Sequence, residues 1–424
     1  MNVIRIFCRR NLLRHARQNV LYSHCRLCSD QRQQSDKLLS QIQAKIKFSG
    51  PITVADYMNV ALTNTEQGYY INKDVFGQKG DFTTSPEISQ MFGELVAVWF
   101  VNEWMMAGSP DNVKLIELGP GRGTMADDML RAFSKFPELT KSLSLHLVEI
   151  SKKLSEMQEE KLSSNPSSMS SDIDSDSTPY YKQCVSKYGP NVYWYRDITD
   201  VPAGHTMIVA HEFFDALPIH KFQKTDRGWR EVLVDIDPES NNDLRFVLAP
   251  TESAASKVIL QVDSDDNRDH IEVSAKSGVI IKHLADRIDT NGGCGLVIDY
   301  GHNGEKEDTF RAFRNHDLHD VLIEPGSADL TADVDFSYLK KQCNDTVKTF
   351  GPVTQSSFLQ NLGIAYRLKM LYDKADEKGK KDLLSSFHML TDSEQMGERF
   401  KFLAILNNKC KHSPIGFDPL PVDS

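Results

Sequence analysis

The sequence predicts an α/β fold of the doubly wound, Rossmann-like type, and three observations support it. From Val113 onward, short apolar runs alternate with polar stretches of helical periodicity, as in a parallel sheet with crossover helices. A glycine-rich turn follows the first apolar run, and single carboxylates close the next two. Glycine-rich turns and strand-end side chains of this kind line the ligand crevice of doubly wound sheets.

The first folded segment, residues 51–108, is predicted to be helical and to act as a lid. Thr53 is a candidate N-cap, and Ser85-Pro86-Glu87 has the residue types of a strong helix start. The helix that begins there should run to about Met106. Residues 81–85 before it either close over a ligand or form a tight turn that docks the long helix.

The predicted core, residues 109–350, carries five recognisable strands and two additions. The strands are expected at residues 113–118, 143–150, 192–195, 206–211 and 295–300. Residues 163–177 include eight serines in fifteen positions and are predicted to form a solvated loop. Residues 219–291 exceed what one crossover needs, so an insertion is expected there.

Two further segments follow the core. Residues 351–410 show helical periodicity and are predicted to form a helical C-terminal cap over the strand ends. Residues 411–424 contain three prolines and are predicted to be a disordered tail.

The N-terminus differs in charge from the rest of the chain. Residues 1–29 carry six arginines and no acidic residue, which indicates a mitochondrial presequence; a frayed basic tail is the alternative. Residues 30–50 are polar and are predicted to be a tether or a partial helix. Without residues 1–29, 43 basic side chains face 59 acidic ones, so the formal charge changes from -10 to -16. This balance argues against a protein that binds nucleic acid by neutralising phosphates.

Membrane-spanning and metal-binding classes find no support in the sequence. The longest apolar run, residues 95–101, is far shorter than the roughly 20 residues of a transmembrane helix. Among seven cysteines, the one close pair, Cys25 and Cys28, lies in the predicted presequence and has no second ligand pair. No metal site and no transmembrane segment are therefore expected.

The sharpest motif is the turn that contains Gly119, Gly121 and Gly123, preceded two positions earlier by Glu117. The dinucleotide fingerprint has the spacing G-x-G-x-x-G, whereas this turn has G-x-G-x-G, and no P-loop lysine follows. S-adenosylmethionine suits this arrangement because its cationic end tolerates a carboxylate and it has no pyrophosphate to bind. The sequence therefore favours S-adenosylmethionine as the cofactor.

Carboxylates at the ends of the next two predicted strands extend this site. Glu149 is placed to accept both ribose hydroxyls of a nucleoside that lies across the strand ends, and Asp197 is placed to meet the adenine amino group. Each alone would be read as a solvated strand-end carboxylate. Their register after the glycine turn favours one nucleoside-thioether site.

The fourth predicted strand ends in a group of candidate catalytic residues, His211, Glu212 and Asp215. Two carboxylates three positions apart, with aromatic rings between them, can hold a guanidinium group, which prefers planar bidentate acceptors and stacks on rings. A guanidinium also needs a nearby base, because it must lose a proton when its nitrogen is methylated. The alternative is that both rings are core and Asp215 is a helix cap.

Four segments resemble the MidA family of proteins: residues 80–94, 117–124, 212–218 and 298–302. The resemblance implies a seven-strand S-adenosylmethionine-dependent methyltransferase fold and a mitochondrial protein-arginine methyltransferase needed for assembly of respiratory complex I. It implies a location in the mitochondrial matrix and symmetric dimethylation of an arginine on a core matrix-arm subunit. It also implies that the three glycines at 119, 121 and 123 hold the cofactor, and that Glu212 and Asp215 lie by the acceptor.

Three points stay open at this level. The family usually has Asn where this chain has His211, and His302 is either a base or a partner of the local backbone. A protein with this fold could also serve as an assembly chaperone that binds its client without essential turnover. An NAD-linked oxidoreductase is disfavoured by the glycine spacing.

Overall fold

The computed structural model describes residues 35–72, 84–165, 178–240, 243–260, 262, 266–343 and 345–418. The predicted presequence and most of the predicted serine-rich loop lie outside the described residues. Residues 73–83 of the predicted lid segment and the last six residues of the chain lie outside them as well. Within the described part, no helix combines the length and the apolarity that crossing a bilayer requires.

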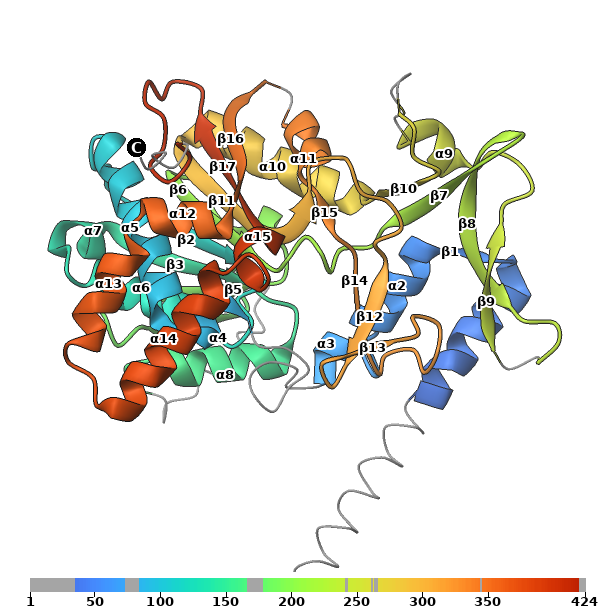
Figure 1. Cartoon of the computed structure of the whole chain (residues 1–424), viewed down its shortest axis with the longest axis horizontal. Coiled ribbons are helices and arrows are strands. Elements are labelled where there is room, and N and C mark those ends of the chain that lie inside the picture. The colour runs from blue at the N-terminus through green and yellow to red at the C-terminus, as the bar shows by residue number, and fades with distance from the viewer. Residues whose placement is uncertain are drawn as a thin grey trace, which may run out of the picture.

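A mixed sheet forms the centre of the protein (Figure 1). Its strands, in spatial order, are β16 (Val347–Thr354), β17 (Phe400–Asn407), β11 (Gly293–His302), β6 (Thr206–His211), β2 (Val113–Leu118), β3 (Leu143–Val148), β5 (Asn191–Tyr195) and β4 (Lys182–Val185). β11, β6, β2, β3 and β5 are parallel, so their carboxyl ends meet at one edge. A ninth strand, β15 (Val334–Asp335), pairs with the end of β11. The α/β prediction is confirmed; in the described part of the chain this sheet has nine strands, where the predicted fold has seven.

Helices cover both faces of this sheet, as the doubly wound prediction requires. On one face, Leu115, Leu145 and Val209 pack against helices from both ends of the chain. These helices are α5 (Gln90–Met106), α6 (Thr124–Phe133), α12 (Gln355–Asn361), α13 (Ile364–Tyr372) and α14 (Glu377–Thr391). On the other face, Ile116 and Ile208 pack against α10 (Ala275–Asn291) and α11 (Phe336–Gln342).

The remaining helices of this body lie among its connecting segments. They are α4 (Ser85–Ile88), α7 (Pro137–Ser142), α8 (Lys152–Leu162), η1 (Ile198–Asp200) and α15 (Met396–Arg399). α4 and α15 lie near each other, because the Ser85 hydroxyl reaches the Met396 sulfur at 3.9 Å. Both therefore border the end of β6, where the candidate catalytic residues lie.

A second body stands beside the central sheet and is built from three distant parts of the chain (Figure 1). Its five-stranded sheet consists of β1 (Ile52–Thr53), β7 (His220–Thr225), β8 (Gly228–Ile236), β9 (Leu244–Leu248) and β10 (His270–Val273). A three-stranded sheet adds β12 (Arg311–Arg314), β13 (Asp317–His319) and β14 (Asp329–Thr331). The helices are residues 35–49, α2 (Val54–Thr63), α3 (Tyr69–Asn72) and α9 (Ala254–Val258). One apolar cluster joins all three parts, because Leu38, Val234 and Leu330 belong to it.

The structure bears on four expectations about the ends and additions of the chain. Residues 35–49 form a helix, the alternative to a tether, because Leu38, Ile42 and Ile46 recur every fourth residue and are buried. Residues 351–410 are not wholly helical, since β17 joins the central sheet. The insertion expected in residues 219–291 is confirmed, because its strands belong to the second sheet and α10 returns to cover the central one.

The prediction of a disordered tail, residues 411–424, is wrong for residues 411–418. Residues up to 418 lie on the core, where Trp99 donates a hydrogen bond to the Ile415 carbonyl at 3.1 Å. The Phe417 ring also packs on Phe358, with 5.6 Å between centroids. Apolar residues between the prolines therefore anchor this segment.

Candidate functional site

The glycine turn after β2 takes a shape that other residues rarely adopt. Gly119, Gly121 and Gly123 have φ values of +61°, +52° and +75°, in the left-handed region that favours glycine. A Cβ atom on Gly119 would lie 3.0 Å from the Phe213 ring. The turn therefore brings bare backbone close to the acceptor loop, residues 211–215.

A cavity of about 40 Å³ lies at this turn. Its lining includes five of the predicted site residues, namely Glu117, Gly119, Gly121, His211 and Glu212. The structure thus brings the predicted cofactor turn and part of the predicted catalytic group to one cavity. Gly123, Glu149, Asp197 and Asp215 do not line it.

Glu117 is a buried carboxyl with an unpartnered oxygen, and it lines the cavity at the glycine turn. Its side chain is 2% exposed, and its Oε2 atom has no hydrogen-bond partner among the described residues. Burial raises the pKa of Glu117 to about 8, because a buried carboxylate loses its hydration. A cationic ligand with N–H donors, such as the amino-acid end of S-adenosylmethionine, fits this orphan oxygen and favours its ionised form.

Glu149 joins the turn through a residue that the sequence did not single out. Gln158 of α8 donates hydrogen bonds to the Gly121 carbonyl at 2.7 Å and to Glu149 Oε2 at 3.1 Å. The Trp194 indole N–H in turn donates to the side-chain Oε1 atom of Gln158 at 2.8 Å. Burial raises the pKa of Glu149 to about 7, against the lowering effect of bonds from Ser151 and Gln158. Gln158 therefore fixes both the turn and the carboxylate.

The remaining two cofactor candidates lie at the borders of this region. Gly123 is the N-cap of α6, and a Cβ atom there would lie 3.3 Å from the Gln158 side chain. Asp197 is exposed at the end of β5, where it caps η1 by accepting bonds from the Thr199 amide and hydroxyl. These bonds lower its pKa and keep it ionised.

Glu212 has the most unusual backbone in the acceptor loop. Its φ is +47°, and its amide donates to the Ile298 carbonyl at 3.0 Å, which fixes this left-handed turn. The Ser85 amide, at the start of α4, bonds to its carboxyl group. Burial and the neighbouring Asp215 raise the pKa of Glu212 well above its usual range. Its Oε1 atom has no hydrogen-bond partner in the described part of the chain.

His211 is a neutral residue in this setting. Burial lowers its pKa to about 3, because the imidazolium form would lose its hydration. Its Nε2 atom lies 3.4 Å from Glu212 Oε1, and its ring lies between Phe92 and Phe400. A neutral imidazole can donate one hydrogen bond, as the amide of an asparagine can.

Asp215 points away from the cavity into a buried hydrogen-bond group. Its Oδ2 atom accepts from the Tyr300 hydroxyl and, at 2.8 Å, from the Thr331 hydroxyl. Glu212 and Asp215 therefore do not face one another as a simple clamp. Asp215 is not a helix cap either, and Phe214 is core whereas Phe213 packs on Gly119.

Asp299 of β11 holds the acceptor loop in place. Its Oδ2 atom accepts hydrogen bonds from the amides of Phe213, Phe214 and Asp215 at 3.2, 3.0 and 3.4 Å. Burial and the charges of Asp215 and Glu212 raise its pKa well above the usual range. The strand predicted at residues 295–300 places Asp299 near its end, but the three amide partners of Asp299 could not be predicted from the sequence.

His302 makes local contacts rather than contacts with the cavity. Its Nδ1 atom accepts from the amides of Gly304 and Lys306 at 3.1 and 3.3 Å. It does not line the cofactor cavity. The backbone-partner alternative is therefore the one that the structure bears out.

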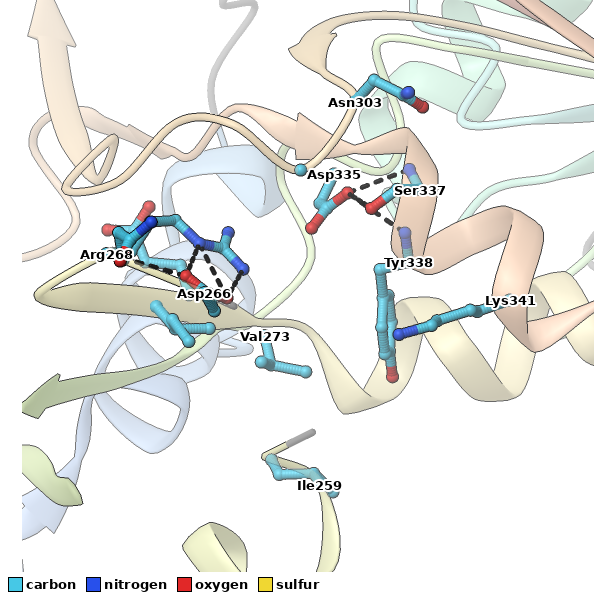
Figure 2. A pocket seen from close by; sticks show the side chains of 13 residues that line it. Ile259, Asp266, Arg268, Val273, Asn303, Asp335, Ser337, Tyr338 and Lys341 are labelled. Carbon is cyan, nitrogen blue, oxygen red and sulfur yellow. Dashed lines mark hydrogen bonds and ion pairs between the residues drawn. The ribbon is translucent and has the colours of Figure 1, made fainter. Parts of the chain in front are cut away.

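A larger cavity, of about 350 Å³, lies elsewhere, between β10 and α11 (Figure 2). Its charged groups are engaged within the protein: Arg268 pairs with Asp266 at 2.6 Å, and Asp335 caps α11 through Ser337 and Tyr338. Size alone does not make it the reaction site, because the orphan polar atoms named above lie at the glycine turn.

Comparison with known proteins agrees with this geometry. Residues 95–353 match the model of a family of S-adenosyl-L-methionine-dependent methyltransferases. A solved structure from Burkholderia thailandensis, bound to S-adenosyl-homocysteine, has the same fold, with a TM-score of 0.72 and 23% identity. The matched region spans 92% of this chain and 95% of the Burkholderia thailandensis chain.

Curated relatives are much more similar in sequence. Protein arginine methyltransferase NDUFAF7, mitochondrial, of Mus musculus is 52% identical over 88% of this chain and 85% of its own length. The Homo sapiens protein of that name is 51% identical over 87% of this chain and 83% of its own length. The Drosophila melanogaster homolog is 45% identical over 87% of this chain and 84% of its own length. The chain belongs to the MidA family of S-adenosylmethionine-dependent methyltransferases, and S-adenosylmethionine is its cofactor.

Proposed function

We propose that this protein is a mitochondrial protein-arginine methyltransferase. The observation that carries the proposal is Glu212, a buried carboxyl with an orphan oxygen that lines the same cavity as the glycine turn. Methylating an arginine requires a carboxylate beside the methyl donor, to orient the guanidinium and to take its proton. The names of relatives that are about half identical to this chain support the same activity.

Six residues are proposed to hold the cofactor. Glu117 pairs with its amino group, and Gly119, Gly121 and Gly123 let the backbone approach it. Glu149 accepts from the ribose hydroxyls, and Asp197 accepts from the adenine amino group. The cofactor, when bound, supplies an activated methyl group on a cationic sulfur.

The proposed reaction is a direct displacement. A guanidinium nitrogen forms a bond to the methyl carbon as the carbon–sulfur bond breaks, and the nitrogen loses one proton. Glu212 orients the guanidinium and accepts the proton; burial raises its pKa, and the positive charge of the guanidinium favours the ionised form that this step requires. In the described part of the chain, Nε2 of the neutral His211 lies 3.4 Å from Glu212 Oε1 without a hydrogen bond between them, while Asp215 acts through Tyr300. The protein thus contributes alignment and charge placement.

The finer expectations belong to this proposal. The product is symmetric dimethylarginine, and the client is a core matrix-arm subunit of respiratory complex I in the mitochondrial matrix. The resemblance to the MidA family is their support. The relatives are named mitochondrial arginine methyltransferases, which implies a protein substrate.

Binding and turnover test the proposal separately. Gly121→Val should abolish S-adenosylmethionine binding in calorimetry, because a side chain is strained at a φ of +52°. Glu212→Gln should bind the cofactor but lose methyl transfer to complex I subunits, measured by mass spectrometry of arginine. Asp215→Asn should lower the rate less.

Two outcomes would count against this assignment. Normal cofactor affinity in Gly121→Val would remove the turn from the site. Full turnover in Glu212→Gln would remove Glu212 from the mechanism. A client that binds but carries no methylarginine would instead favour the chaperone alternative.

A further inference from the structure

A row of rings leads from the cofactor cavity to the protein surface. His211, which lines the cavity, stacks on Phe400 with 6.4 Å between centroids and 20° between planes. Phe400 in turn meets Tyr300 edge to face at 5.5 Å. The Tyr300 hydroxyl bonds to Asp215 and Thr331, so this ring is fixed beside the acceptor loop.

Two guanidinium groups already lie against the Tyr300 ring. The Cζ atoms of Arg311 and Arg399 are 5.2 and 5.3 Å from its centroid, within the range of cation–π contacts. The two arginines differ in how they are held. Arg311 pairs with Asp333 at 2.6 Å and donates to the Thr309 carbonyl at 2.9 Å.

Among the described residues, Arg399 has no comparable anchor. It is exposed at the end of α15, and among the described residues it forms no ion pair. Its next neighbour, Phe400, pairs with Tyr300 across β17 and β11, which sets it at the edge where the acceptor loop lies. The ring face is therefore the contact that positions this guanidinium.

The chemistry of this place suits a guanidinium from outside. The Tyr300 ring is fixed by the carboxylate of Asp215, in the loop that also carries Glu212. Such a ring offers a planar cation a stacking surface with acceptors near its rim. A lysine ammonium would gain less, because it is compact and cannot stack.

We propose that the face of Tyr300 is the stacking surface for the arginine of the protein substrate, and that Arg399 occupies it until that arginine displaces it. This inference rests on the proposed arginine methyltransferase activity. Arg399 is then a competitor within the chain, and the ring sets the preference for arginine over lysine. A cation–π contact at an exposed site changes an equilibrium constant roughly two- to fivefold, which sets the size of the expected competition.

Steady-state methylation of a recombinant complex I matrix-arm subunit with tritiated S-adenosylmethionine tests this. Arg399→Met keeps the apolar stem and removes the charge, so the KM for the subunit should fall about two- to fivefold while kcat changes little. The Ki of N-acetyl-arginine amide as a competitor should fall by the same factor, and that of N-acetyl-lysine amide should not. Arg245→Met is the matched control, because Arg245 is also exposed but lies on β9.

Tyr300 variants separate the ring from its hydroxyl. Tyr300→Leu should raise the KM and the Ki of N-acetyl-arginine amide, whereas Tyr300→Phe should keep the Ki and lower kcat through Asp215. If either variant fails to fold, Arg399→Lys keeps the test valid, with a KM between those of wild type and Arg399→Met.

The outcomes distinguish this inference from the proposed function. An active wild type whose KM and Ki are unchanged in Arg399→Met overturns the inference alone. Methylation of Arg399 itself, seen by mass spectrometry, also overturns it, because Arg399 would then be a substrate. A wild type that binds S-adenosylmethionine but methylates no arginine overturns the proposed function.

Discussion

At the scale of single residues, the Gln158 side chain, which lies outside the cavity, connects the glycine turn to Glu149. Its amide joins the Gly121 carbonyl, the Glu149 carboxyl and the Trp194 indole, which come from three elements. Each partner is a polar group that would be left unsatisfied in a buried setting if the amide were lost. The affinity for the cofactor therefore depends on a residue that is not expected to touch it.

Replacing Gln158 by leucine should weaken S-adenosylmethionine binding by at least about tenfold. The reason is that leaving even one buried polar group unsatisfied costs about 1–3 kcal/mol, and here the turn and Glu149 both lose a donor. Isothermal titration calorimetry measures the effect. Gln360→Leu is the control, because Gln360 is exposed on α12 and bonds Ser356. An unchanged Kd in Gln158→Leu would show that the bridge is dispensable.

The two buried carboxyls of the cofactor region predict a pH dependence. Burial raises the pKa of Glu117 from 4.5 to about 8 and that of Glu149 to about 7. In the free protein, their contribution to stability is therefore complete below about pH 4.5 and is lost as the pH rises through 7 and 8. A ligand that donates hydrogen bonds to them favours the ionised form, so binding should release protons.

S-adenosylmethionine should accordingly bind more tightly as the pH rises from 6 to 7.5, by up to about tenfold per unit for each proton released. Calorimetry in two buffers of different ionisation enthalpy counts the protons. Glu117→Gln should release fewer protons and flatten the profile. An affinity that falls over this range in the wild type would contradict the assignment of Glu117.

At the scale of elements, the helix of residues 35–49 is part of the fold. Ile42 is 2% exposed and belongs to the cluster that also holds β8 and β14. Ile42→Ala should lower the free energy of unfolding by about 2–4 kcal/mol, since it leaves a cavity in a packed core. Phe48→Ala on the same helix is the matched control, because Phe48 is 94% exposed and should change stability by less than about 0.5 kcal/mol. Urea denaturation measures both, and equal effects would mean that the helix is not docked.

Elements with a local signal were predictable, and elements defined by distant partners were not. The five parallel strands carry short apolar runs between helices, so their positions follow from the sequence. β17 is buried on both faces and lacks alternation, so periodicity could not separate it from a helix. In residues 35–49 the apolar positions recur every fourth residue, but most of the segment is polar. The sequence alone therefore did not separate a docked helix from a linker.

The same division holds for the candidate site. A glycine in a turn or a carboxylate at a strand end indicates a ligand site from its local sequence alone. The sequence could therefore predict four of the cavity residues, namely Glu117, Gly119, Gly121 and Glu212. Gln158 lies within a polar helix, and Thr331 is 116 positions from its partner Asp215. Their roles arise only when the fold brings them to the site. Asp215 was predicted to face an acceptor with Glu212, but its carboxyl turns toward Tyr300 and Thr331 instead.

At the scale of the whole molecule, the surface charge should steer the encounter with a client. The full chain has a formal charge of -10, which becomes -16 if the six N-terminal arginines are removed. A negative field of this size attracts a basic partner over a distance that salt shortens, to about 10 Å at 0.1 M. The buried cofactor site is screened much less.

Raising NaCl from 50 to 300 mM should therefore increase the KM for a basic matrix-arm subunit several-fold, with a smaller change in kcat. Over the same range, the Kd for S-adenosylmethionine should change less than about twofold, because Glu117 and Glu149 are buried. N-acetyl-arginine amide is the control acceptor, since one charge is steered far less than a basic protein surface. Equal salt dependence of the small and the large acceptor would locate the effect in the acceptor site near Glu212, and the surface field would then play no part in recognition.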